Sequence, residues 1–451
     1  MNTFDISFAV IAFREAEFYS NIAQYLKEKK GINSAFLTFY EPADRYLANK
    51  GHRVFSLHKE LKKTTYKYRK DRERIARKKY GLNSLNDLLF HEAHTFCRFN
   101  EEKLISKLLD YDIFFEKLLS ENKFSLICQE LGGFIAPLSL YYNAKFKNID
   151  HVFFEPSFFK GYLFFDKNTL DAGIDLSVGI SEKDINNVKE YIRGYLKNKP
   201  VAIPEKDKHH FKDANLKKII NKRNIMQLSK KIFYKYIMRE KEEYDAIFNH
   251  VKQNILRLFR RLALSKHYYI PDFSVKYAYF PLHVPIDFAL TVRQNGLYDQ
   301  LSLIEKVAKT IPVDKTLYIK EHPAAIGAYN VKKLKSLINN YRIKLVHPKI
   351  NSYDLIKNSE YVLTINSKVG IEALMQGKPV YALGHSYYSS AKGVTVVTEI
   401  NDLKNISVDG SLHAVDYAFF AKVYRSSFKG ELYNNNEENI KSFSDNLAKF
   451  I

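Results

Sequence analysis

Short apolar runs alternate with segments of helical spacing between residues 316 and 384. The runs are rich in β-branched and aromatic residues and predict four strands: Thr316–Ile319, Ile343–Val346, Tyr361–Thr364 and Pro379–Ala382. Between them, Tyr353–Asn358 and Val369–Gln376 carry apolar residues three and four positions apart, as expected of helices. This alternation predicts half of a parallel, doubly wound α/β sheet.

Polar residues follow two of the predicted strands directly. Lys320, His322 and Pro323 follow one strand, and Asn366 and Ser367 follow another. Lysine and histidine can bind a phosphate or a base edge, and proline ends the strand that presents them. The Asn-Ser pair precedes a helix, where unpaired backbone N–H groups bind anions. Because ligands of parallel sheets bind at the carboxyl ends of the strands, these residues predict a nucleotide pocket.

Glu372 lies about one and a half turns into the predicted helix, where its carboxylate could accept hydrogen bonds from ribose hydroxyls. A simpler alternative stays open for two of these residues. Ser367 could be only the N-cap of the helix, and Glu372 only a solvated helix carboxylate. The convergence of all the polar positions favours the nucleotide pocket.

A further polar loop follows the predicted strand Tyr277–Phe280. It carries His283, Asp287 and Arg293, and an amphipathic helix is predicted after it at Leu301–Lys309. We expect this loop to face a cleft between two domains, which is the usual place for a ligand.

The N-terminal half also begins with an α/β pattern. A strand is predicted at Ile6–Phe13, a helix at Glu15–Lys29 and a second strand at Ala35–Phe39. No glycine-rich phosphate loop lies between them, which argues against a dinucleotide fingerprint.

Two later strands of this half are predicted at Phe124–Cys128 and His151–Glu155. The first is followed by Gly132 and Gly133, which permit close backbone approach by a ligand or merely a tight turn. The second is followed by an aromatic loop that leads to Asp171 and Gly173. A carboxylate at a strand end beside aromatic rings suits general acid or base chemistry, which makes Glu155 a candidate. The alternative is a loop carboxylate that caps backbone N–H groups.

Two segments are strongly basic, and the net charge of the chain is +21. Lys59–Tyr80 is predicted to be helical, with a solvated surface helix as the simplest interpretation. Residues 204–269 are lysine-rich, with apolar residues interleaved at helical spacing. An anionic membrane surface, nucleic acid and an interdomain helical pair with one wet face are the alternatives for this segment.

Composition limits the classes of protein. The chain has 451 residues, of which 46% are hydrophobic and 27% charged, as in a globular protein of two or three domains. Its two cysteines cannot form a disulfide framework, which indicates a reducing compartment. We recognise neither a targeting signal nor an apolar run long enough to span a bilayer, so a cytoplasmic protein is expected, at most peripheral on the inner face of the membrane.

Three sequence elements together resemble the bacterial capsule and lipopolysaccharide biosynthesis glycosyltransferases that include the β-Kdo transferases. These elements are PLHVPID, IKEHP and TINSKVGIEALMQGKPVYALG. The earlier FFEP and TLDAGID segments look like the acidic motif of the same family's N-terminal domain. His322-Pro323 and Asn366-Ser367 are also similar to elements of bacterial sialyltransferases, which use CMP-activated sugars.

The resemblance implies a GT-B fold with two Rossmann-like domains that face an interdomain cleft. The expected organisation is an acceptor-side domain at 1–200, a basic helical insertion at 201–270, a nucleotide-sugar donor domain at 271–415, and C-terminal helices at 416–451 that pack back across the junction. The expected partners are a nucleotide-sugar donor and a glycan or lipid-linked acceptor, with an anionic membrane surface as a further candidate and no nucleic acid.

The resemblance also implies roles for residues. Lys320 and His322 would contact the cytidine and phosphate of CMP-Kdo, Ser367 the phosphate, and Glu372 the ribose. A retaining double displacement would use Asp287 as nucleophile and Glu155 as general base, with Asp166 and Asp171 as alternative carboxylates. No metal or other cofactor is expected.

Overall fold

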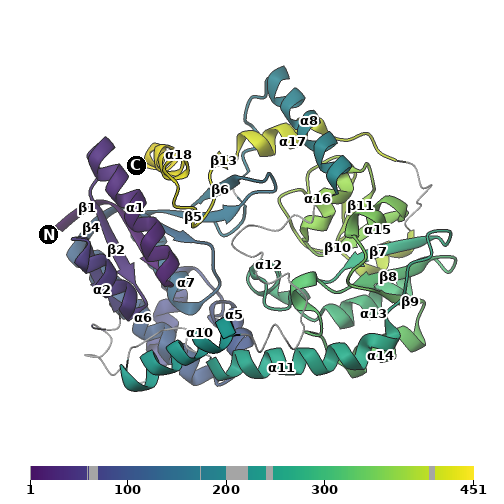
Figure 1. Ribbon diagram of the computed structural model, residues 1–451, viewed down its shortest axis with the longest axis horizontal. Coiled ribbons are helices and arrows are strands. Elements are labelled where there is room, and N and C mark those ends of the chain that lie inside the picture. Colours follow the sequence, from purple (N-terminus) through teal and green to yellow (C-terminus); the bar gives the residue numbers. More distant parts are fainter. Residues whose placement is uncertain are drawn as a thin grey trace. The chain divides into compact units, whose positions relative to one another are not determined.

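The computed structural model describes residues 2–57, 59, 70–172, 174–199, 222–239, 247–405 and 412–451 (Figure 1). The chain divides into two compact units. Unit 1 consists of Met1–Gly173, Ile220–Asn249 and Ser427–Ile451, and unit 2 consists of Ile174–Ile219 and His250–Ser426. Each unit contains a mostly or wholly parallel sheet flanked by helices. The predicted α/β class, with the two Rossmann-like domains of a GT-B chain, is confirmed.

The sheet of unit 1 has the strand order β13-β6-β5-β4-β1-β2-β3. Its strands are β1 Asn2–Val10, β2 Ser34–Thr38, β3 Arg53–Ser56, β4 Asn122–Glu130, β5 Asp150–Pro156, β6 Tyr162–Lys167 and β13 Phe428–Lys429. β1 to β5 are parallel, whereas β6 and β13 run antiparallel to their neighbours. The order reverses between β1 and β4, which makes that position the topological switch point of the sheet.

Helices cover the two faces of this sheet. They are α1 Phe13–Lys30, α2 Glu41–Asn49, α4 Lys70–Tyr80, α5 Asn86–Phe96, α6 Glu101–Glu121, α7 Ile135–Phe146 and α18 Glu437–Leu447. Alternate residues of β1 reach different clusters because successive strand side chains point to opposite faces. Phe8 packs in a cluster with residues of α1 and α18, and Ala9 packs in a second cluster with residues of α6 and α7.

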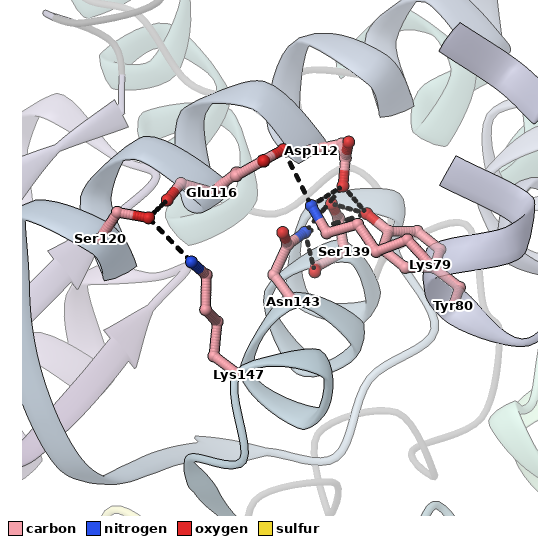
Figure 2. A network of polar contacts seen from close by, with 8 residues as sticks. All are labelled: Lys79, Tyr80, Asp112, Glu116, Ser120, Ser139, Asn143 and Lys147. Atoms are coloured by element: carbon pink, nitrogen blue, oxygen red, sulfur yellow. Dashed lines mark hydrogen bonds and ion pairs between the residues drawn. The ribbon is translucent and has the colours of Figure 1, made fainter. Parts of the chain in front are cut away.

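A buried polar network joins α4, α6 and α7 of unit 1 (Figure 2). Lys79 Nζ lies 2.9 Å from Asp112 Oδ1 and 3.1 Å from Glu116 Oε2. The Tyr80 hydroxyl and the Asn143 amide also donate to Asp112 Oδ1, at 2.6 and 3.1 Å. The predicted solvated helix at Lys59–Tyr80 is therefore wrong for Lys79, whose side chain is only 6% exposed. Residues 60–69 of that segment lie outside the described residues.

The sheet of unit 2 is wholly parallel, with the strand order β12-β11-β10-β7-β8-β9. Its strands are β7 Tyr277–Pro281, β8 Thr316–Lys320, β9 Ile343–Val346, β10 Tyr361–Thr364, β11 Val380–Ala382 and β12 Val394–Val396. Its helices are α8 Glu182–Asn198, α11 Ile247–Leu264, α12 Phe288–Thr291, α13 Gln300–Thr310, α14 Val331–Asn340, α15 Ser352–Asn358, α16 Lys368–Met375 and α17 Tyr417–Arg425. The order reverses between β10 and β7.

The five strands predicted for this sheet are confirmed within one residue at each end, and the three predicted helices correspond to α13, α15 and α16. The helix α14 and the edge strand β12 were not predicted. In unit 1, the predicted aromatic loop after Glu155 is wrong. Its residues form a hairpin in which β6 pairs antiparallel with β5, and Glu155 lies opposite Phe164. Phe164 and Phe165 are buried residues of β6, and Phe158 and Phe159 are buried in the turn between the two strands.

The units divide at different positions from those expected. Residues 174–199 belong to unit 2, where α8 packs on α17 and Tyr195 bonds Glu372. The C-terminal segment is shared, because α17 belongs to unit 2 and α18 to unit 1. Within the expected insertion at 201–270, residues 200–221 and 240–246 lie outside the described residues. Its described part contains α10 Lys222–Ile232 in unit 1 and α11, most of which belongs to unit 2.

Candidate functional site

Two loops of unit 2 meet where the strand order reverses between β7 and β10. The loop after β7 leads into α12, and the loop after β10 leads into α16. The amide Nδ2 of Asn366 donates to the carbonyl of Ala289 at 2.9 Å and so ties the two loops together. Ligands of open α/β sheets bind at such a reversal, beyond the carboxyl ends of the strands. Asn366 and Asp287, predicted from separate parts of the sequence, are brought together here.

The N-terminus of α16 is held in place by side-chain hydrogen bonds. Ser367 is its N-cap, and its Oγ accepts from the N–H of Val369 at 3.2 Å. The hydroxyl of Tyr388 donates to the Ser367 carbonyl at 2.6 Å. A Cβ on Gly370 would lie 2.5 Å from that hydroxyl oxygen, so only glycine fits there. The predicted N-cap is confirmed, and the other N–H groups of the first turn remain suited to an anion.

Asn366 presents an unused acceptor at this position. Its Oδ1 is buried and has no hydrogen-bond partner among the described residues, while its Nδ2 is held by Ala289. A buried carbonyl oxygen without a donor is costly unless a ligand or water supplies one. This oxygen is therefore a ready acceptor for an N–H or O–H group of a ligand.

The loop after β7 places a carboxylate and an imidazole near each other. Asp287 is exposed and is the N-cap of α12, where its Oδ1 accepts from the N–H of Ala289 at 2.9 Å. No described residue bonds its Oδ2. His283 is 5% exposed, and its Nε2 has no partner among the described residues. Burial lowers the pKa of His283 to about 4, against the opposing charge of Asp287, so its imidazole is neutral near pH 7.

His322 and Lys320 follow β8 but have different surroundings. His322 is half-buried, and its Nδ1 accepts from the N–H of Ala324 at 3.2 Å, which leaves the proton of the neutral ring on Nε2. Pro323 occupies the first position of the short 3₁₀ turn that begins there. Lys320 is 4% exposed, and its Nζ donates to the Ile350 carbonyl at 2.6 Å and the Ser352 hydroxyl at 2.9 Å. Contact between Lys320 and a phosphate would require these bonds to break.

Glu372 of α16 accepts a hydrogen bond from a residue that the sequence did not mark. The hydroxyl of Tyr195 in α8 donates to its Oε1 at 2.7 Å. Burial raises the pKa of Glu372, and the charge of Lys320 opposes that increase. The alternative of a solvated helix carboxylate is therefore wrong. Tyr195 carries no signal of its own in the sequence, because it belongs to an amphipathic helix 177 residues before Glu372.

Two predicted residues remain, Arg293 in unit 2 and Glu155 in unit 1. The guanidinium of Arg293 lies 5.3 Å from the centre of the Phe288 ring, just after α12. Glu155 belongs to β5 of unit 1 and is half-buried. The structure therefore groups His283, Asp287, Asn366 and Ser367 around one strand reversal of unit 2.

Comparisons with known proteins identify the family of the chain. The model of the family described as capsule polysaccharide biosynthesis protein matches residues 200–425, half of the chain. Protein FixF of Sinorhizobium fredii (strain NBRC 101917 / NGR234) is 33% identical over 129 residues, 28% of this chain and 31% of that protein. The capsule polysaccharide export protein KpsS of Escherichia coli is 29% identical over 125 residues, 26% of this chain and 28% of that protein. The matched segments thus span about a third or less of these curated relatives.

Solved structures with similar chains have low identity. The β-Kdo 2,7 transferase KpsC of Thermosulfurimonas dismutans is 14% identical with a TM-score of 0.38, over 78% of this chain and 97% of that one. The UDP-GlcNAc 2-epimerase of Methanocaldococcus jannaschii is 13% identical with a TM-score of 0.31, over 99% of both chains. The family match rests instead on the sequence of the segment that carries the site. The chain belongs to the capsule polysaccharide biosynthesis protein family.

Proposed function

We propose that this protein is a retaining β-Kdo transferase that moves Kdo from CMP-Kdo to a lipid-linked or glycan acceptor in capsule or lipopolysaccharide biosynthesis. Membership of the capsule family supports a role in that pathway. The observation that carries the proposal is the meeting of the Asp287 and Asn366 loops at the strand reversal of unit 2. Transferases that use another nucleotide sugar, such as CMP-sialic acid or a UDP-sugar, and a non-catalytic polyanion-binding protein are the competing functions.

The donor would be held by groups of unit 2. The N-terminus of α16 at Ser367 would bind the phosphate through backbone N–H groups. His322 would donate its Nε2–H to the phosphate or to the base, and Asn366 Oδ1 would accept from the amino group of cytosine. The Tyr195 hydroxyl donates to Oε1 of Glu372, and the other oxygen, Oε2, would accept a hydrogen bond from a ribose hydroxyl. Lys320 would support this edge of the sheet through the loop after β9.

Retention at the anomeric carbon follows from two displacements. Oδ2 of Asp287 attacks the anomeric carbon, the bond from that carbon to the phosphate oxygen breaks, and CMP leaves with the electron pair. The N-cap bond to Ala289 would hold the carboxylate in one orientation for this attack. An acceptor hydroxyl then forms a bond to the anomeric carbon and displaces Asp287, while a general base takes its proton. Glu155 is the carboxylate predicted from the sequence, and neither step calls for a metal.

A membrane surface is the proposed location of the acceptor. The segment 222–239, which contains α10, has six cationic and no acidic residues. Six of its apolar side chains are between 37% and 68% exposed: Ile225, Met226, Ile232, Phe233, Tyr236 and Ile237. Exposed apolar residues beside lysines are typical of a helix that lies on anionic lipid. No helix in the described part of the chain is both long and apolar enough to cross a bilayer.

Nucleotide release from a panel of sugar donors tests the proposed function. CMP-Kdo, CMP-sialic acid, UDP-GlcNAc and GDP-mannose are compared, with wild-type protein and the Asp287→Ala and His322→Ala variants. We expect release of CMP from CMP-Kdo alone, and loss of this release in both variants. Asp272→Ala, which changes a loop residue of the same unit, is the matched control and should release CMP as the wild type does. Turnover only with a UDP- or GDP-sugar would overturn the Kdo assignment. Release of no nucleotide, together with salt-sensitive binding of polyanions, would favour the binding protein.

A further inference from the structure

Helix α11 packs against the rest of unit 2 with its arginine-bearing side. Nη1 of Arg260 donates to the carbonyl of Ala328 at 3.1 Å. The Arg257 carbonyl lies so close to Gly327 that a Cβ on this glycine would be 2.2 Å from the carbonyl oxygen. Leu264, the last residue of the helix, is fully buried in the core of the unit. Because these three helix residues are three and four positions apart, they mark the inner face of α11.

The outer face of α11 carries a row of exposed apolar side chains. The row consists of four residues that are between 37% and 63% exposed: Val251, Ile255, Phe259 and Leu262. Their spacing of three and four positions keeps them within about 80° of the helix circumference, over a length of about 17 Å. A surface helix usually buries such a stripe against its own core. In α11 the apolar stripe is turned to solvent instead, so it is a candidate contact surface.

The charged residues around this row are all positive. Residues 247–271 include five lysines and arginines and no acidic residue. Lys252 and Lys266 are exposed near the two ends of the row. Lysines in such positions can reach phosphate groups while the apolar side chains between them leave water. The surface therefore fits a partner that offers both negative charge and apolar groups.

Charge decides between the partners that could cover the row. A second copy of the chain would bring two sets of cations together, and each copy has a net charge of +21, so repulsion opposes a dimer through this face. A partner protein would need an apolar groove with an acidic rim. An anionic lipid surface supplies phosphates for the lysines and acyl chains for the apolar row at once. Charge complementarity therefore favours lipid.

We propose that the outer face of α11 docks on an anionic lipid surface, with its apolar row inserted at the boundary between headgroups and acyl chains. The inference rests on the proposed membrane location of the acceptor, and it does not depend on the identity of the sugar donor. The contact is separate from the one proposed for the segment 222–239, because that segment belongs to unit 1 and the row belongs to unit 2. Unit 2 thus has a lipid contact of its own.

The inner face of α11 is linked to the loop that carries His322. The N–H of Gly327, which lies against the Arg257 carbonyl, donates to Oε1 of Glu321 at 2.9 Å. The hydroxyl of Tyr268, shortly after α11, donates to Oε2 of the same carboxylate at 2.7 Å. Glu321 is fully buried and directly precedes His322. Docking of α11 therefore holds this loop of the candidate site at a fixed distance from the lipid.

A fluorescent dye on the outer face of α11 tests the contact directly. Cys97 is exposed and is first replaced by serine, whereas Cys128 is buried and is kept. Phe259→Cys in the whole chain is then labelled and mixed with vesicles of phosphatidylglycerol and phosphatidylcholine that carry a nitroxide on the acyl chains. Val313→Cys, at an 84% exposed apolar residue just before β8, is the matched control. We expect the nitroxide to remove most of the fluorescence at position 259 and none at position 313.

Serine substitutions measure how much the row contributes to binding. Phe259→Ser combined with Leu262→Ser removes two exposed apolar side chains, so we expect the fold to be retained, which thermal unfolding checks. Partition into the same vesicles should weaken about 10-fold or more, because both side chains lose their transfer out of water. Val313→Ser removes an exposed apolar side chain elsewhere in the unit and should leave the partition unchanged.

The outcomes separate this inference from the proposed function. Full fluorescence at position 259 on protein that is bound to the vesicles would overturn the inference and leave the contact of the segment 222–239 standing. Self-association that the serine variant abolishes, without quenching by the lipid, would assign the row to a second copy of the chain. No binding to anionic vesicles at all would overturn both lipid contacts, whereas release of CMP in the absence of lipid would still support the proposed transferase.

Discussion

Replacing Glu15 by glutamine changes how the stability of the protein depends on pH. Glutamine has nearly the same shape as glutamate, and its amide oxygen can still accept the N–H groups of Ile11 and Ala12. The difference is the charge. In the wild type, burial and the charge of Glu130 raise the pKa of Glu15 from its ordinary value of 4.5 to about 7.

The sign and size of the effect follow from this difference. The folded protein binds the proton of Glu15 more tightly than the unfolded chain does, so its stabilising contribution is complete below about pH 4.5. That contribution is lost as the pH rises through about 7, and the free energy of unfolding falls by ~3 kcal/mol. Glutamine does not titrate. At pH 8.5 the Glu15→Gln variant should therefore be more stable than wild type by ~3 kcal/mol, and at pH 5 by much less.

Thermal unfolding from pH 5 to 8.5 measures this difference. For a unit of this size, ~3 kcal/mol corresponds to a midpoint shift of about 6–12 °C. Glu17→Gln removes a carboxylate from the same helix, and we expect its midpoint to follow that of the wild type at every pH. If the curves of wild type and Glu15→Gln stay parallel across the range, Glu15 titrates as an ordinary surface carboxylate and the reasoning fails.

Three further predictions test other parts of the molecule. Asp112→Ala leaves Lys79 buried without its nearest carboxylate, so the free energy of unfolding, measured by urea titration, should fall by about 3–5 kcal/mol. Glu121→Ala is the control, because it breaks an exposed pair with Lys117 and should change the free energy of unfolding by less than about 1 kcal/mol. Gly370→Ala forces a methyl group against the Tyr388 hydroxyl, so the free energy of unfolding should fall by about 1–3 kcal/mol. Calorimetry should also show weaker binding of CMP. Unchanged binding would mean that the N-terminus of α16 is not part of the donor site. The third prediction replaces three lysines of the segment 222–239 by glutamate: Lys230, Lys231 and Lys235. This change should weaken binding to phosphatidylglycerol vesicles in a flotation assay at least about 100-fold, and unchanged binding would contradict the membrane proposal.

Much of unit 2 could be predicted because its signals are local. Tyr361–Thr364 is a short apolar run bounded by polar residues, and it is a strand with the predicted bounds. Ser367 stands before a helical pattern, and it is the N-cap. Such features depend on the few residues around them, since backbone propensity and capping act over one turn or one strand.

Other features could not be predicted because local patterns do not distinguish them. The aromatic run after Glu155 has the composition of a strand and of an apolar loop, and only its pairing with β5 decided between them. Lys79 belongs to a run of cations whose pattern predicts a solvent-exposed helix. Packing of α4 against α6 and α7 nevertheless buries its side chain beside Asp112. Whether a charged side chain is exposed depends on which elements cover it.

The sequence by itself therefore determined the α/β class, the strands of the second sheet, and the polar residues at their carboxyl ends. Only the tertiary structure decided which of these residues meet. The bond between Asn366 and Ala289 spans 77 residues, that between Tyr195 and Glu372 spans 177, and that between Tyr433 and Glu130 spans 303. Such contacts arise from the order of strands in a sheet, and that order depends on the pairing and packing of distant segments, which no short window of sequence records.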